Sequence, residues 1–238
     1  MTRPLAPPLP VTAPHGSLGL PQGIALYIGS VLGTGLLVLP GIAAQVAGPA
    51  SIVAVIAVII LSVPLAGTFA ALAARFPDPG GVASYARRAL GPTAARMTGY
   101  WFLFGVCAGA PVVAMLGGEY VAAVVGADRA VVPVLAVLFL ALPFAVNGFG
   151  VRVAGRLQLA LTALLLAVVV AVVALAAPSV EPRNFEPFLP HGWAGVGTAI
   201  SLFVWAFAGW EVGTHVSGEF RNARRVIPIA TAVALVVT

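Results

Sequence analysis

The sequence of 238 residues contains no lysine, a single cysteine and very little charge. Charged side chains make up 8% of the chain, whereas a soluble domain carries about 25%. This shortage excludes a water-facing surface over most of the chain, and therefore excludes an ordinary soluble domain. Because Cys107 is the only thiol, neither an intrachain disulfide nor a cysteine-based metal site can form.

Clustered catalytic, metal-binding and nucleic-acid-binding motifs are also lacking. His215 lies one turn after Glu211, but no third ligand accompanies them, so we expect no metal site and no cofactor. Ser217 follows His215 without a nucleophile elbow, and we therefore expect no enzyme activity. The net charge of +5 comes from arginines spread between apolar runs, a pattern typical of membrane topology signals and not of nucleic-acid binding.

Long apolar runs are what the sequence has in abundance. With 61% hydrophobic residues it predicts an all-α polytopic membrane protein, since about 20 apolar residues cross the hydrocarbon core. Six full spans are predicted, at 20–46, 50–74, 97–125, 131–150, 157–177 and 193–219. The run 226–238 is too short to cross and is predicted to be a truncated seventh span. Residues 1–18, with five prolines, predict a disordered cytoplasmic tail, and 19–238 the transmembrane domain.

The arginines test this span count. If the N-terminus is cytoplasmic, ten arginines fall in inner segments and two in outer segments, which is a strong positive-inside bias. The outer pair is Arg129 and Arg183, and the inner set is Arg3, Arg75, Arg87, Arg88, Arg96, Arg152, Arg156, Arg221, Arg224 and Arg225. We therefore expect a multi-pass protein of the cell membrane with a cytoplasmic N-terminus. The connection 76–95 favours a short amphipathic helix on the cytoplasmic face.

The first predicted span is interrupted by small residues at mid-membrane depth. Gly33 and Gly35 flank Thr34, and each glycine weakens a helix by about 1 kcal/mol relative to alanine. Irregular backbone at this depth is tolerated only where it is buried in protein or lines a cavity. Unwound N–H groups here would suit a carboxylate, and carbonyls around Ser30 would accept from an ammonium group. Close packing of Gly29, Gly33 and Thr34 against another helix remains an open alternative.

The sixth predicted span carries a second interruption, Trp205-Ala206-Phe207-Ala208-Gly209-Trp210-Glu211. Two interrupted helices at corresponding positions of two halves indicate the substrate site of an inverted-repeat transporter. Glu211 follows this break, and an ionisable residue inside a span is a functional candidate. Its structural alternative is to cap backbone N–H groups that the break leaves free. Glu119, near the outer end of 97–125, is expected either to pair within the bundle or to reach the interface.

Three motifs, taken in their order and spacing, resemble the amino acid–polyamine–organocation (APC) superfamily of permeases. They are Gly29-Ser30-Val31-Leu32-Gly33-Thr34-Gly35; Phe76-Pro77-Asp78-Pro79-Gly80-Gly81 with Tyr85; and Trp205 to Glu211 followed by Gly218-Glu219-Phe220-Arg221-Asn222 and Pro228. Within the superfamily the motif sequences are most similar to those of bacterial exporters of methionine and branched-chain amino acids. That narrower likeness lies in Leu32-Gly33-Thr34-Gly35, Gly80-Gly81-Val82-Ala83 and Thr98-Gly99-Tyr100-Trp101-Phe102-Leu103.

The resemblance implies a fold of two inverted five-helix repeats, of which this chain is the N-terminal part. Substrate would lie between discontinuous first and sixth helices, with its carboxylate at Thr34 and Gly35. The implied binding residues are Ser30, Val31, Gly33, Thr34, Gly35, Trp205, Ala206, Phe207, Ala208 and Gly209, with Glu211 as the coupling group. The implied activity is secondary transport of neutral aliphatic amino acids, with export as one direction, coupled to a proton or an exchanged amino acid. A non-transporting half-permease or structural membrane subunit is the alternative.

Overall fold

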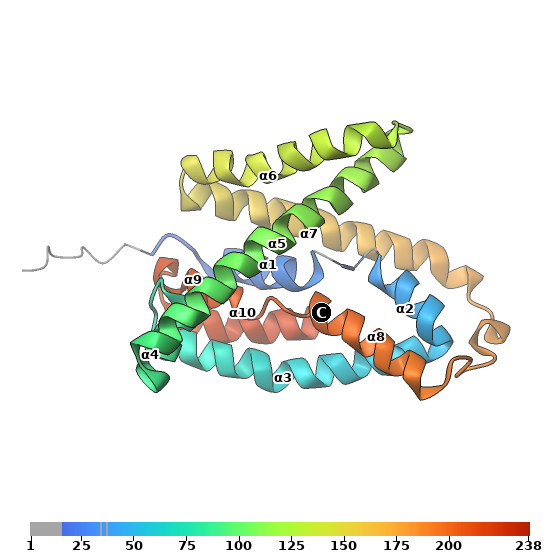
Figure 1. Cartoon of the computed structure of the whole chain (residues 1–238), viewed down its shortest axis with the longest axis horizontal. Helices are drawn as coiled ribbons and strands as arrows, with labels where there is room; N and C mark the ends of the chain where they lie inside the picture. The colour runs from blue at the N-terminus through green and yellow to red at the C-terminus, as the bar shows by residue number, and fades with distance from the viewer. Residues whose placement is uncertain (1–15, 34, 37) are drawn as a thin grey trace, which may run out of the picture.

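The computed structural model describes residues 16–33, 35–36 and 38–238, and this part of the chain is built from α-helices (Figure 1). In chain order they are α1 (Leu20–Leu32), α2 (Leu39–Ala47), α3 (Ser51–Arg75), α4 (Gly81–Leu90), α5 (Pro92–Val125), α6 (Val132–Gly148), α7 (Val151–Ala176), α8 (Gly192–Ala206), α9 (Val212–His215) and α10 (Ala223–Val237). Helices α3, α8 and α10 lie together on one side, α6 and α7 lie on the other, and the long α5 crosses diagonally.

Within the described ranges, four helical segments are long and apolar enough to cross a membrane. They are Leu39–Arg75, Pro92–Val125, Arg129–Gly148 and Val151–Ser179. Helices α1 and α8 are also apolar but have only 13 and 15 residues. These helices support the predicted all-α polytopic membrane protein, and the count of six spans stays a prediction.

Helices α5 and α7 begin before the apolar runs that predict them. The run 97–125 belongs to a helix that starts at Pro92, and the run 157–177 to one that starts at Val151. Proline suits the first position of a helix because its missing N–H has no partner there in any case. Apolar runs mark the hydrocarbon core, whereas a helix continues beyond that core wherever its backbone can bond internally.

A stripe of small residues on α3 lets α8 and α10 pack against it. Its buried members recur every three or four residues and therefore share one helix face. They are Ala54, Ser62, Ala66, Ala70 and Ala73, with Val58 among them. Large side chains on the rest of α3, such as Ile56 and Ile60, are exposed. Lipid tails can cover such a face, because they are as apolar as the side chains.

The centre of the bundle lies around α1, which packs between α7 and α10. Tyr27 and Val31 of α1 are buried, as is Trp210 in the segment between α8 and α9. The rings of Tyr27 and Trp210 stack with their centroids 6.3 Å apart. These buried contacts therefore join α1, which precedes the first predicted break, to the segment of the second.

Candidate functional site

Regular helix stops at both predicted interruptions. Helix α1 ends at Leu32 and α2 begins at Leu39, and the described residues 33, 35–36 and 38 form turns. Helix α8 ends at Ala206 and α9 begins at Val212. Between them Gly209 has a φ of +153°, a conformation that a side chain would strain. Thr34, which the resemblance implicates in carboxylate binding, lies outside the described residues.

The two interruptions contact each other directly. The Ser30 hydroxyl donates to the Gly209 carbonyl (3.1 Å) and to the Tyr27 carbonyl (2.9 Å). A Cβ atom on Gly209 would lie 2.7 Å from the Ser30 carbonyl oxygen, so only glycine allows this approach. Across the same junction, a Cβ on Gly35 would lie 3.3 Å from the Cβ of Ala206. Four predicted site residues are thus neighbours: Ser30, Gly35, Ala206 and Gly209.

Glu211 holds the second interruption in place. One of its carboxylate oxygens accepts from the Gly209 N–H at 3.0 Å. Its own carbonyl accepts from the N–H and the hydroxyl of Thr214, at 2.8 and 2.6 Å. The carboxylate therefore satisfies a backbone donor that the broken helix leaves without a helical partner. The carboxylate makes no cap on the N–H groups of α9, and a role in coupling stays a prediction.

A cavity of about 390 Å³ adjoins the second interruption. It is lined by Ala208 and Glu211 together with residues of α5, namely Trp101, Phe102, Gly105 and Val106. Sequence analysis did not include these four α5 residues in the site. Trp101 and Phe102 stand in a motif of the resemblance, but an apolar stretch carries no signal that distinguishes cavity lining from lipid contact. Trp205 is not among the lining residues, and its side chain is 48% exposed.

The helix turns that lead to the first interruption pack closely against α7. A Cβ on Gly29 would collide with the Gln158 side chain of α7, beside Thr162. The Thr162 hydroxyl donates to the Ala25 carbonyl at 3.1 Å, which fixes α7 against α1. The Gly33 N–H donates to the Gly29 carbonyl at 3.0 Å. Gly29 therefore serves close packing, and the Gly33 N–H is engaged in the last helical turn.

The remaining predicted site residues lie deeper in the bundle or at its edge. Val31 is almost fully buried, and Phe207 is also buried. The carbonyls of Val204 and Trp205 both accept from the Ala208 N–H, at 3.1 and 3.3 Å. The carbonyls of Val204 and Trp205 also accept from the Phe207 N–H, so both are engaged at the end of α8.

The second motif of the resemblance, Phe76 to Gly81, lies against α9 and the turn that follows it. The Asp78 N–H donates to the Ser217 hydroxyl at 3.1 Å, and Gly81 lies against the His215 ring. The Asp78 carboxylate accepts from the Gly80 N–H and the Ser84 hydroxyl, both at 2.8 Å. These bonds lower the pKa of Asp78, and the N–H of Gly80 has the larger effect.

Tyr85 of α4 lies in the same segment as this motif and is buried, which raises its pKa to about 12.

The segment before α1 is held by backbone hydrogen bonds to the segment after α9. The Leu18 N–H donates to the Glu219 carbonyl at 2.9 Å, and the Arg221 N–H donates to the Leu18 carbonyl at 3.1 Å. The segment before α1 and the segment after α9 are therefore tied to each other by backbone bonds.

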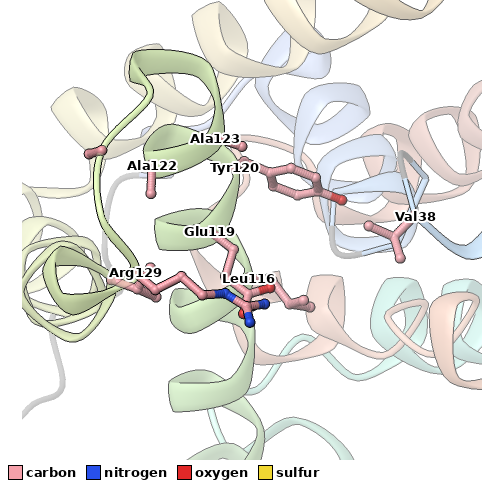
Figure 2. Close-up of a pocket in the computed structure, with 9 residues that line it drawn as sticks. Val38, Leu116, Glu119, Tyr120, Ala122, Ala123 and Arg129 are labelled. Carbon is pink, nitrogen blue, oxygen red and sulfur yellow. The ribbon is translucent and has the colours of Figure 1, made fainter.

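A second cavity, of about 420 Å³, lies at the far end of α5 (Figure 2). Glu119 and Arg129 meet on its wall with 3.9 Å between charged atoms, and the Tyr120 ring points towards Val38. Glu119 thus pairs with an exposed arginine just before α6 and not inside the bundle. Both partners remain substantially exposed, so the pair contributes little to stability.

Comparisons with known proteins connect this geometry to a family. The family described as "Amino acid permease" matches residues 18–238. The uncharacterized amino acid permease YecA of Bacillus subtilis is 32% identical over 213 residues, covering 90% of this chain and 50% of that protein. The L-methionine/branched-chain amino acid exporter YjeH of Escherichia coli is 34% identical over 221 residues, covering 92% of this chain and 52% of that protein. The branched-chain amino acid permease BcaP of Bacillus subtilis is 26% identical, with 89% and 50% covered. The chain spans about half the length of these relatives.

Proposed function

Because the chain belongs to the amino acid permease family, we propose that it forms the substrate-binding half of a secondary transporter for neutral aliphatic amino acids. The single observation that carries this proposal is the contact between the two helix interruptions, where the Ser30 hydroxyl bonds to the Gly209 carbonyl. Two broken helices that meet within a membrane bundle place unpaired backbone groups around one point, which suits a ligand with two opposite charges.

Backbone groups would recognise the two charged ends of the amino acid. N–H groups at Thr34 and Gly35, at the start of the outer half of the first helix, suit the carboxylate. Carbonyls of Val31, Trp205, Ala206 and Ala208 would accept from the ammonium group. Charge-assisted bonds of this kind are about twice as strong as neutral ones, so few are needed.

The lining of the adjoining cavity favours an apolar substrate side chain. Among the described residues Glu211 is the only ionisable group on it, and its carboxylate already accepts from the Gly209 N–H. Trp101, Phe102 and Val106 supply apolar surface, and no basic residue of the described ranges lines the cavity. A cationic or anionic substrate side chain would find no dedicated partner there. The methionine and branched-chain amino acids for which YjeH and BcaP are named belong to the same class, which supports this choice.

The proposed topology treats α1 with α2 as the first span and α8 with α9 as the sixth. It places six full spans and part of a seventh in the cell membrane, with the N-terminus in the cytoplasm. The arginine distribution supports it. This arrangement corresponds to the first repeat, and the start of the second, of an inverted-repeat transporter. Glu211 is the candidate for coupling to a proton.

An exchange assay tests the proposal. Proteoliposomes that contain the full natural protein bearing this chain, preloaded with unlabelled L-methionine, are expected to take up labelled L-methionine and L-leucine. Labelled L-arginine should not enter. If no amino acid exchanges, although the protein is inserted and folded, the transport proposal is wrong.

A further inference from the structure

We propose that the corner between α4 and α5 binds the headgroup of an anionic phospholipid, with Arg87 and Arg96 as its phosphate ligands. A hollow of about 400 Å³ at this corner is lined by Arg87, Pro92, Ala95 and Arg96. The inference rests on the proposed cytoplasmic orientation of this corner and otherwise goes beyond the proposed transport function.

The backbone brings these two arginines to one hollow. Arg87 lies in the last turns of α4 and Arg96 in the first turns of α5. Gly91 between the helices has a φ of +90°, which allows the chain to reverse in a single residue. The Gly91 N–H donates to the Arg87 carbonyl at 3.0 Å, so the corner is fixed by a bond.

Neither arginine of the hollow forms an ion pair within the described part of the chain. Its two ion pairs are Glu119 with Arg129 and Glu181 with Arg183, and neither involves this corner. Asp78 is the only acid between residues 76 and 96, and Gly80 and Ser84 donate to its carboxylate.

The neighbouring arginines are already engaged with an aromatic ring. Arg88 lies over the ring of Phe76 at 4.6 Å, and Arg75 lies at 5.5 Å from the same ring centre. The two arginines of the hollow differ from these neighbours because neither lies over an aromatic ring, although Arg87 is near enough to Asp78 to help lower the pKa of its carboxyl. Basic hollows at the cytoplasmic ends of membrane helices are suited to lipid phosphates.

An apolar track leads from the hollow along α5 and argues for a lipid over a soluble phosphate. Tyr100 and Phe104 follow Arg96 at intervals of four residues, which places the three on neighbouring positions of one helix side. Their side chains are 60% and 66% exposed, and their rings stack with centroids 6.4 Å apart. From Arg96 to Phe104 the track rises about 12 Å along the helix. An acyl chain attached to a bound headgroup can lie along it.

Native mass spectrometry of the full chain in neutral detergent tests the site. Dioleoylphosphatidylglycerol is titrated against the wild-type chain and against the double variant Arg87→Gln with Arg96→Gln. The double variant is expected to bind it roughly thirtyfold more weakly, since each arginine at an anionic surface contributes about a fivefold factor. Dioleoylphosphatidylcholine, which has no net charge, should bind both proteins weakly and equally.

A matched control removes two other arginines of the same predicted membrane side. Arg152→Gln with Arg156→Gln changes the net charge equally, and both side chains are exposed. This variant should keep wild-type affinity, as should Arg87→Lys with Arg96→Lys, which retains the charge. An equal loss in the Arg152 and Arg156 variant would overturn the proposal in favour of general charge attraction.

Free glycerol 3-phosphate separates a lipid site from a phosphate site. It should bind far more weakly than the lipid, because it cannot use the Tyr100 and Phe104 track. Binding as tight as that of the lipid would contradict the proposal. None of these measurements depends on transport, so their failure and the failure of the proposed function are distinguishable.

Discussion

The two helix interruptions are built differently, although they meet at one point. Near the first, hydrogen bonds of the helical pattern persist, from the Gly33 N–H to Gly29 and from the Leu39 N–H to Gly35. The second depends on Gly209, whose φ is +153°, and on the Glu211 carboxylate that accepts from its N–H. The turn of the second interruption is held by a side chain of its own, Glu211, whereas the described part of the first is held by neighbouring helices.

This difference indicates that the two segments have different roles. A segment that is held by its own side chain keeps one geometry whether a ligand is present or not. The residues around Gly35 have close neighbours in Leu39 and Ala206, but no side-chain cap is recorded for the described ones. We therefore expect substitutions at the second interruption to affect folding and binding, and substitutions at the first to affect mainly binding.

The largest effect is expected from Gly209→Val. Its Cβ would lie 2.7 Å from the Ser30 carbonyl oxygen, and backbone strain alone costs about 1–3 kcal/mol. The variant should lose L-methionine binding and unfold at a lower temperature, as measured by tryptophan fluorescence. Gly197→Val in α8, where a Cβ meets nothing within 4 Å, should leave both properties near wild type. If the two variants bind L-methionine equally well and unfold at the same temperature, Gly209 has no special role.

Gly35→Leu should abolish binding while leaving insertion and helix content intact. The new side chain would fill the space beside Ala206 in which the substrate carboxylate is proposed to lie. Gly41→Leu, at an open position of α2, is the control and should bind L-methionine normally. Unchanged affinity in Gly35→Leu would favour the packing interpretation of the first interruption.

Glu211 is tested by two substitutions that separate its hydrogen bond with the Gly209 N–H from coupling. In Glu211→Gln the amide oxygen can still accept from the Gly209 N–H, so affinity should stay close to wild type. In Glu211→Ala the charge-assisted bond is lost, and affinity should fall roughly tenfold or more. If the carboxylate couples transport to a proton, exchange by Glu211→Gln should lose its dependence on pH. A pH profile identical to that of the wild type would mean that Glu211 serves only to accept the hydrogen bond from the Gly209 N–H and does not couple transport to a proton.

The smallest effect is expected from Ser30→Ala, which removes the hydroxyl that joins the two interruptions. One neutral hydrogen bond contributes about 1 kcal/mol, so L-methionine should bind about fivefold more weakly. Ser201→Ala removes a hydroxyl that bonds only within α8, to the Gly197 carbonyl, and should have no effect on binding. A loss in Ser201→Ala equal to that in Ser30→Ala would contradict a specific role for the bridge.

The helical class, the family and the positions of both interruptions could be inferred from the sequence, because each has a local signal. Apolar runs of about 20 residues predict helices, and glycines beside Thr34 and at Gly209 predict breaks. The contact of the motif at 76–81 with Ser217, after α9, is not predicted from the sequence.

Other parts of the site depend on contacts that no local pattern encodes. Phe102 and Gly105 of α5 line the cavity beside Glu211, yet they read as ordinary members of an apolar run. The bond between Ser30 and Gly209 joins residues far apart in the chain. From the sequence, Gly29 could serve either packing or binding. Packing is favoured by the structure, because the Gln158 side chain of α7 lies where a Cβ on Gly29 would be.

The central claim is that the meeting point of the two interruptions recognises both charged ends of an amino acid. It is tested most directly by competition against labelled L-methionine, using L-methionine methyl ester and N-acetyl-L-methionine. Each analogue lacks one charge and keeps the side chain, so each should compete roughly ten- to a hundredfold more weakly than L-methionine. If both analogues compete as well as L-methionine itself, the two interruptions do not form a site for a zwitterion.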